Sequence, residues 1–203
     1  MTDDARRLQA YANCMGQIKA RIALVDQFLA EWRSQSVATD LACELAALQL
    51  RKIYELIAFS AMSADLQKYS AVKGAFARDR NFAEIIARLS KLNPDFLPKP
   101  ILRVSSQEMG VNWHMEERPE AALSKDDLLY RHGFLGKFLH ASNPFGAGNN
   151  PSAALLRFDT WVREIAALLS QHRYVVGPNQ EGYIIELHGH DEDVTAHYYQ
   201  VRP

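Results

Sequence analysis

The sequence predicts a mainly α protein of the α+β kind, a bundle of about five helices with a mid-chain β-hairpin and a C-terminal β-hairpin. Apolar residues recur at helical spacings in four stretches, residues 4–33, 40–62, 82–92 and 151–169. The run NPDFLPKP, residues 93–100, cannot lie inside a helix because its three prolines lack amide donors and fix φ. Two segments, residues 101–118 and 182–201, alternate apolar and polar positions, which is typical of hairpins.

The bulk composition predicts one domain, residues 1–203, with a C-terminal hairpin appendage at about 173–203. A hydrophobic content of 48% is ordinary for a globular chain that buries a sizeable core. The net charge of -1 excludes a general electrostatic attraction to nucleic acid or anionic membrane. Arginine outnumbers lysine by 15 to 8, so a local basic patch stays open.

The beginning of the sequence shows no secretory signal, because no apolar run follows its charged residues. No apolar window of about 18 residues occurs, so we expect no membrane association. Cys14 and Cys43 form no CxxC pair and fit small core residues of a reducing compartment. The expected location is the cytoplasm.

The clearest helix covers residues 4–33. Its apolar side chains repeat like a heptad, at Leu8, Tyr11, Met15, Ile18, Ile22, Val25, Leu29 and Trp32. Such a stripe packs along another helix at a shallow angle. That helix belongs either to this chain or to a second copy, and the strong helix that follows at once favours a hairpin within the chain.

The second helix, residues 40–62, is expected to start at Asp40 as its N-cap. It is apolar almost all round, which indicates a position in the middle of the bundle. Glu44, Arg51 and Glu55 fall within an arc of about 40° on an ideal helix. Buried charges need partners, so these three either pair with one another or with Lys137, or line a polar pocket into which His140 projects.

Later elements are marked by their end signals. Residues 64–80 predict a helical piece and a loop near Gly74, and Asn81 starts a short amphipathic helix. Ser124 with Asp127 resembles a capping box that opens a helix extending past His140. Asn150 and Pro151 open the next helix, as N-cap and first helical residue. The two hairpins are expected to turn near residues 108–110 and 190–193.

Two glycines mark one face of the helix that Ser124 opens. Each interior glycine costs a helix about 1 kcal/mol relative to alanine, so Gly133 and Gly136 suggest that something approaches that face closely. Lys137 and His140 follow on the same side, three residues apart. A lysine beside a histidine suits a phosphodiester, with the histidine as acid or base. The alternative is close packing of a neighbouring helix.

The following loop, residues 143–152, contains Asn143 and several glycines before a helix N-terminus. Such a loop could hold an anion, but it lacks the lysine and the preceding strand of a phosphate loop. An ordinary helix connection is the expected reading, with Asn143 a candidate ligand contact. The histidines at 188, 190 and 197 lie beside a charged turn that solubility explains, so no metal and no cofactor are predicted.

The run YRHGFLGKFLH, residues 130–140, in this helical context resembles the HEPN superfamily, compact helical bundles of which many are metal-independent ribonucleases of toxin, defence and RNA-processing systems. The motif of that family is an arginine, often followed by a polar residue, and a later histidine. Here Arg131 precedes the polar His132, and His140 follows. The resemblance implies a homodimer with two sites facing each other across a cleft.

In that comparison Arg131 or Lys137 would hold the phosphate, and His140 would activate or orient the ribose 2′-hydroxyl. Glu44 and Arg51 would set the electrostatics of the site.

The function that the sequence favours is an interaction module of a larger complex, docking through the first helix or the edge of the C-terminal hairpin. The alternatives are a HEPN-like ribonuclease and a binder of small anionic ligands. The expected partners are a second copy, another protein or RNA, and the sequence does not decide whether the protein is an enzyme.

Overall fold

The computed structural model describes residues 3–64, 69, 81–107, 113–141, 148–176, 181–189 and 192–199. Over these residues it contains five α-helices and a five-stranded antiparallel sheet. The predicted mainly α fold with two hairpins is therefore confirmed. The helical piece and loop predicted for residues 64–80 lie outside the described residues, apart from residues 64 and 69. Residues 108–112, 177–180 and 190–191 also lie outside them, so the turn predicted near 108–110 and the first half of the turn predicted near 190–193 are not described.

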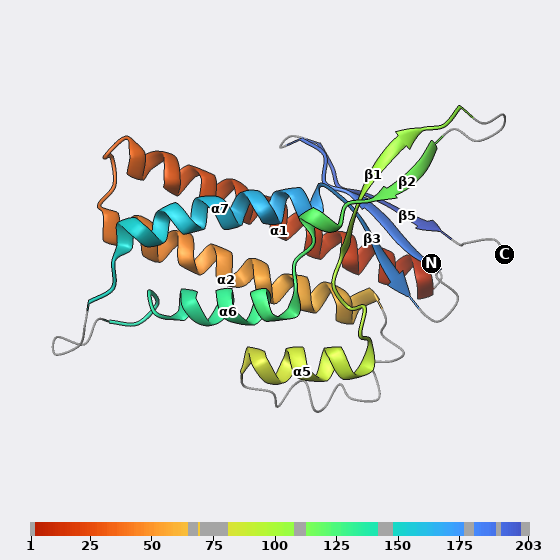
Figure 1. Ribbon diagram of the computed structural model, residues 1–203, viewed down its shortest axis with the longest axis horizontal. Helices are drawn as coiled ribbons and strands as arrows, with labels where there is room; N and C mark the ends of the chain where they lie inside the picture. Colours follow the sequence, from red (N-terminus) through yellow and green to blue (C-terminus); the bar gives the residue numbers. More distant parts are fainter. Residues whose placement is uncertain are drawn as a thin grey trace.

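The first two helices form a hairpin within the chain. Helix α1 (Asp3–Arg33) ends where Gln35 takes a positive φ of 58°, and α2 (Thr39–Ala64) returns alongside it (Figure 1). The heptad side chains Tyr11, Ile18 and Val25 are fully buried in this arrangement. The predicted intrachain hairpin is thus confirmed, because the apolar stripe of α1 is covered by its own chain.

Helix α2 occupies the centre of the bundle and contacts α1, α5, α6 and α7. Its outer stripe nevertheless faces solvent, with Leu41, Leu48 and Phe59 among the exposed apolar side chains. The expectation that this helix is buried all round is therefore wrong. Asp40 lies in the first turn, one residue after the helix begins, so it does not serve as the predicted N-cap.

Three helix starts follow the predicted local signals. Asn81 caps α5 (Phe82–Leu92), and Asn150 caps α7 (Pro151–Ser170), whose first residue is proline. Ser124 and Asp127 form a complete capping box at α6 (Lys125–Gly136). These caps satisfy amide donors that a helix N-terminus leaves unpaired.

The end of α6 differs from the prediction. The helix ends at Gly136, and the chain continues with successive i→i−3 hydrogen bonds from Lys137, Phe138 and Leu139. The side-chain amide of Asn149 donates to the Lys137 carbonyl at 2.8 Å, which occupies an acceptor that a longer helix would use. Lys137 and His140 therefore do not continue the helical face of Gly133 and Gly136.

The strands are β1 (Lys99–Ser105), β2 (Trp113–Glu117), β3 (Gln171–Val176), β4 (Glu181–Glu186) and β5 (Thr195–Tyr199). They lie in the order β2-β1-β3-β4-β5 with antiparallel neighbours throughout. Both predicted hairpins are present, β1 with β2 and β4 with β5. The sequence did not predict β3, which follows α7 without a loop and joins the two hairpins into one sheet.

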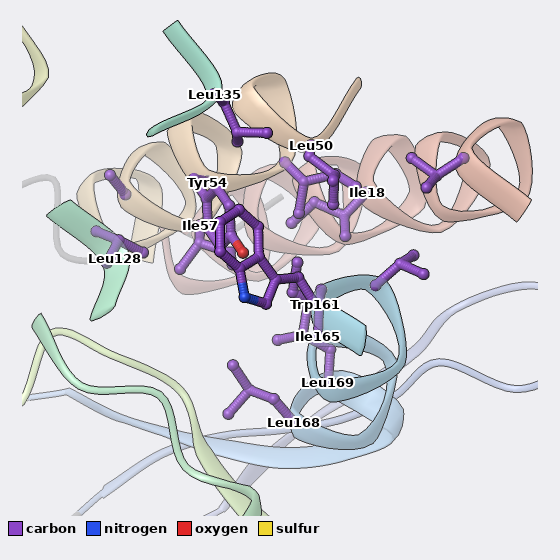
Figure 2. Packing of buried hydrophobic residues seen from close by; sticks show 14 of the residues in the cluster. Ile18, Leu50, Tyr54, Ile57, Leu128, Leu135, Trp161, Ile165, Leu168 and Leu169 are labelled. Atoms are coloured by element: carbon purple, nitrogen blue, oxygen red, sulfur yellow. The ribbon is translucent and has the colours of Figure 1, made fainter. Parts of the chain in front are cut away.

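The core is shared by the helices and the sheet. Figure 2 shows its helical centre, where side chains of α1, α2, α6 and α7 meet, among them Ile18, Leu50, Trp161 and Ile165. Tyr174 of β3 and Ile185 of β4 belong to the same buried cluster. Over the described residues, no helix combines the length and apolar character that crossing a bilayer requires.

A buried hydrogen-bond chain ties α1 to the sheet. The Nδ1–H of His172 donates to the Leu169 carbonyl at 3.0 Å, so its Nε2 accepts from the Tyr11 hydroxyl, also at 3.0 Å. Complete burial of His172 lowers its pKa to about 4. The imidazole is therefore neutral at physiological pH and links three elements of the fold.

We predict that stability falls with acidification between the ordinary histidine pKa of 6.5 and about 4 because of His172. In that range His172 binds a proton in the unfolded chain but stays neutral in the folded chain. The loss reaches up to about 1.4 kcal/mol per pH unit and about 3 kcal/mol in total. Urea unfolding between about pH 7 and about pH 5 should show a shallower pH dependence for His172→Gln than for the wild type. Equal slopes would contradict this assignment.

Candidate functional site

A pocket opens where α2, α5 and α6 meet, three helices that contact one another in pairs. Its volume is about 440 Å³. Its lining residues are Arg51 of α2, Asn81, Phe82 and Ala83 at the start of α5, and Leu129, His132 and Gly133 of α6. In Figure 1 these helices lie side by side on the flank of the bundle opposite α7.

Other hollows are larger. One of about 800 Å³ runs along α1 and is lined mainly by amide and small side chains, such as Gln9, Asn13 and Gly16. Another of about 500 Å³ lies between α1, α7 and His188. The pocket between α2, α5 and α6 differs because a buried histidine, an arginine and a carboxylate meet there in direct contact.

The α6 side of the pocket is one helical face. Leu129, His132, Gly133 and Gly136 stand at positions i, i+3, i+4 and i+7, which place them above one another. A Cβ added at Gly136 would lie 3.3 Å from Nη1 of Arg51, whereas one added at Gly133 would meet nothing within 4 Å. The absence of a side chain at Gly136 is therefore explained by Arg51, and Gly133 leaves the pocket open.

The carboxylate of Glu55 accepts hydrogen bonds from two polar side chains of the pocket, those of Arg51 and His132. Its Oε1 accepts from Nε of Arg51 at 3.3 Å and from Nε2 of His132 at 3.1 Å. Because a carboxylate only accepts, the Nε2 of His132 carries the proton. The imidazole also stacks on Phe82, with ring centroids 4.0 Å apart and an interplanar angle of 19°. The imidazole of His132 is thus fixed by contacts with α2 and α5, whereas Arg51 and Glu55 pair within α2.

The site is electrically balanced in this state. His132 is only 7% exposed, and burial lowers its pKa, assisted by the charge of Arg51 and opposed by Glu55. Its imidazole is consequently neutral near pH 7, and the charges of Arg51 and Glu55 cancel. No described residue accepts a hydrogen bond from the two Nη groups of Arg51, which leaves the forked edge of this guanidinium uncommitted.

The structure brings together four of the predicted site residues, Arg51, Glu55, Gly133 and Gly136. Glu44 lies on an exposed part of α2, nearly two turns before Arg51 and outside the pocket lining. Of the predicted pairing among Glu44, Arg51 and Glu55, the structure therefore shows the ion pair of Arg51 with Glu55, without Glu44.

His140 and Lys137 are not in this pocket. Both are exposed and lie beyond the end of α6, and the Lys137 ammonium is 5.5 Å from the centroid of the Phe134 ring. The expectation that His140 projects toward Arg51 is corrected, because the helix on which it rested ends at Gly136. His132 takes that place. Asn143 lies outside the described residues.

Arg131 points to the other side of α6. Its Nη1 lies 2.6 Å from Glu164 of α7, and its guanidinium carbon is 5.3 Å from the centre of the Trp161 ring. Arg131 therefore joins α6 to α7 and does not share the pocket with His132. A catalytic role for Arg131, Lys137 or His140 stays a prediction.

Two pocket residues were missed by sequence reasoning. His132 was noted only as the polar neighbour of Arg131, and Phe82 only as an apolar residue of its helix. The spacing of Leu129, His132 and Gly133 on one helical face was the available signal for His132. No local signal connects Phe82 to it. Within the described part of the chain, no group of three or more His, Cys, Asp or Glu residues is arranged to hold a metal ion.

The two glycines of α6 should respond differently to alanine. We expect Gly133→Ala to raise the free energy of unfolding by up to about 1 kcal/mol, because helix propensity improves and nothing is displaced. Gly136→Ala should gain less or lose stability, because Arg51 must move away from the new Cβ. Urea unfolding of both variants tests this, and a clear destabilisation by Gly133→Ala would show that the space beside it is not open.

Comparison of the chain with protein-family models, with curated proteins and with solved structures finds no match. The resemblance to the HEPN superfamily therefore stays a prediction.

Proposed function

We propose that this protein binds a small ligand through an anionic group in the pocket between α2, α5 and α6. The observation that carries the proposal is the state of Arg51. Glu55 accepts a hydrogen bond from Nε of Arg51, and the missing side chain of Gly136 leaves room for Nη1. None of the described residues accepts a hydrogen bond from the two Nη groups. A guanidinium held in this way is suited to bidentate contact with a carboxylate or a phosphate.

The remaining lining supports a ligand of this kind. Asn81 and Phe82 form the N-terminal end of α5, where the helix dipole and unpaired amides favour negative charge. Phe82, Ala83 and Leu129 offer apolar surface for the body of the ligand. The volume of about 440 Å³ lies within the range of small-molecule sites, about 300–1,000 Å³.

The two other functions have less support. An interaction module that docks through the α1 stripe would need side chains such as Ile18 and Val25, which are fully buried within the chain. The edges of the sheet remain available for that role. A ribonuclease of the HEPN kind would need Arg131 or Lys137 to hold the phosphate beside His140. Arg131 is ion-paired with Glu164, and Lys137 and His140 lie on the exposed segment after α6. Binding of a second copy, another protein or RNA stays a prediction.

The proposal is tested by calorimetric titration with benzoate and phenyl phosphate, using benzamide and benzyl alcohol as uncharged analogues. We expect the two anions to bind and the analogues to bind much more weakly. Arg51→Gln should weaken anion binding about ten- to hundredfold, since a hydrogen bond to a charged group contributes about 1.5–3 kcal/mol.

Arg157→Gln is the matched control, because Arg157 is an exposed arginine of α7 away from the pocket. It should leave the affinity unchanged, and circular dichroism checks that both variants are folded. Equal losses in the two variants, or an absence of anion binding by the wild type, would contradict the proposal.

A further inference from the structure

The charges of Arg51, Glu55 and His132 sum to zero only while no anion is bound in the pocket. Arg51 and Glu55 form an ion pair with one positive and one negative charge, and the neutral His132 adds none. An entering anion leaves one uncompensated negative charge in a partly buried site. Uncompensated charge in such a place is costly, and the nearest titratable group then tends to change its protonation.

We propose that anion binding in this pocket is coupled to the uptake of one proton by His132. This inference rests on the proposed function, since it concerns the same ligand and the same pocket. The proton goes to Nδ1, because Nε2 already carries a proton that it donates to Glu55. No described residue hydrogen-bonds to Nδ1, so this nitrogen is available to take the proton.

The surroundings of His132 suit the imidazolium form once an anion is present. Glu55 accepts from the ring whether it is neutral or charged. Phe82 stacks on it at 4.0 Å, and an aromatic face stabilises a cation. The protonated ring and Arg51 would then offer two cationic groups to one anion, with Glu55 holding both in place.

Few other charges bear on His132. On α2, Arg51 and Glu55 face His132. Arg51 lowers the pKa of His132, and Glu55 raises it. On α5 the charged group that follows Phe82 in the first turn is Glu84, whose carboxylate accepts a hydrogen bond from the Asn81 side chain at 2.6 Å. On α6 itself, Arg131 turns away to Glu164. The repulsion from Arg51 is the contribution that a bound anion would cancel.

These charges determine whether the affinity for the anion rises or falls with pH. In the empty pocket, burial and Arg51 hold the pKa of His132 below its ordinary value of 6.5. A bound anion raises that pKa, so the bound state takes up a proton between the two values. Anion affinity therefore increases as the pH falls, by up to about tenfold per pH unit within that interval.

The test is calorimetric titration of the whole protein with benzoate, which stays ionised throughout the range, in Bis-Tris and in imidazole buffers. These buffers differ in ionisation enthalpy, so the difference between them gives the number of protons taken up. We expect uptake approaching one proton at about pH 6 and a weaker affinity at about pH 8. His132→Gln keeps a donor for Glu55 but cannot titrate, and it should bind benzoate without proton uptake.

His197→Gln removes an exposed histidine of β5 and should behave as the wild type. An NMR titration of His132 in the wild type, with and without benzoate, gives a second readout that needs no variant, and its pKa should rise on binding. Benzoate binding with no proton uptake, or uptake that persists in His132→Gln, would overturn the coupling while leaving the proposed function standing. No benzoate binding at any pH would overturn both.

Discussion

A buried hydrogen bond from the Tyr11 hydroxyl to His172 ties the sheet to the first helix. Both residues are fully buried, so each polar atom must find its partner within the protein. His172 also donates to the carbonyl of Leu169, near the C-terminal end of α7, where a helix leaves carbonyls unpaired. The His172 side chain therefore occupies a carbonyl at the end of α7 and at the same time holds the start of β3. This allows the chain to pass from α7 into β3 without a loop.

The same principle operates at the pocket, but with charged groups. Glu55 is the common acceptor of Arg51 and His132, so a single carboxylate sets the position of both donors. This arrangement requires α6 to come close to α2. The missing side chain at Gly136 permits the approach, since Nη1 of Arg51 occupies the space that a Cβ would need. The site is thus a product of helix packing and is not carried by a mobile loop.

What could be predicted from the sequence was local. Asn81, Ser124 and Asn150 announce helix starts because a cap is made within a few residues of the chain. The strand β3 gives no such signal, since it follows α7 directly and its partners lie in β1 and β4. The end of α6 was missed for the same reason, because a contact made there comes from Asn149, 12 residues after Lys137.

The candidate site shows the same division between local and distant contacts. The pair of Arg51 and Glu55 was among the alternatives that the sequence offered, because the two residues share one face of a helix, four residues apart. His132 was missed because the contacts that define its role come from Glu55, 77 residues earlier, and from Phe82 of another helix. Without those contacts, His132 cannot be distinguished from any other polar residue of a helix. His140 was therefore selected from the sequence as the candidate histidine.

Neighbouring residues of α6 therefore serve different purposes. Successive side chains on a helix point about 100° apart, so Arg131 and His132 can face different neighbouring helices from the same turn. Arg131 reaches Glu164 and fixes α6 against α7, whereas His132 reaches Glu55 and closes one wall of the pocket. Through these two residues α6 is held against both α7 and α2.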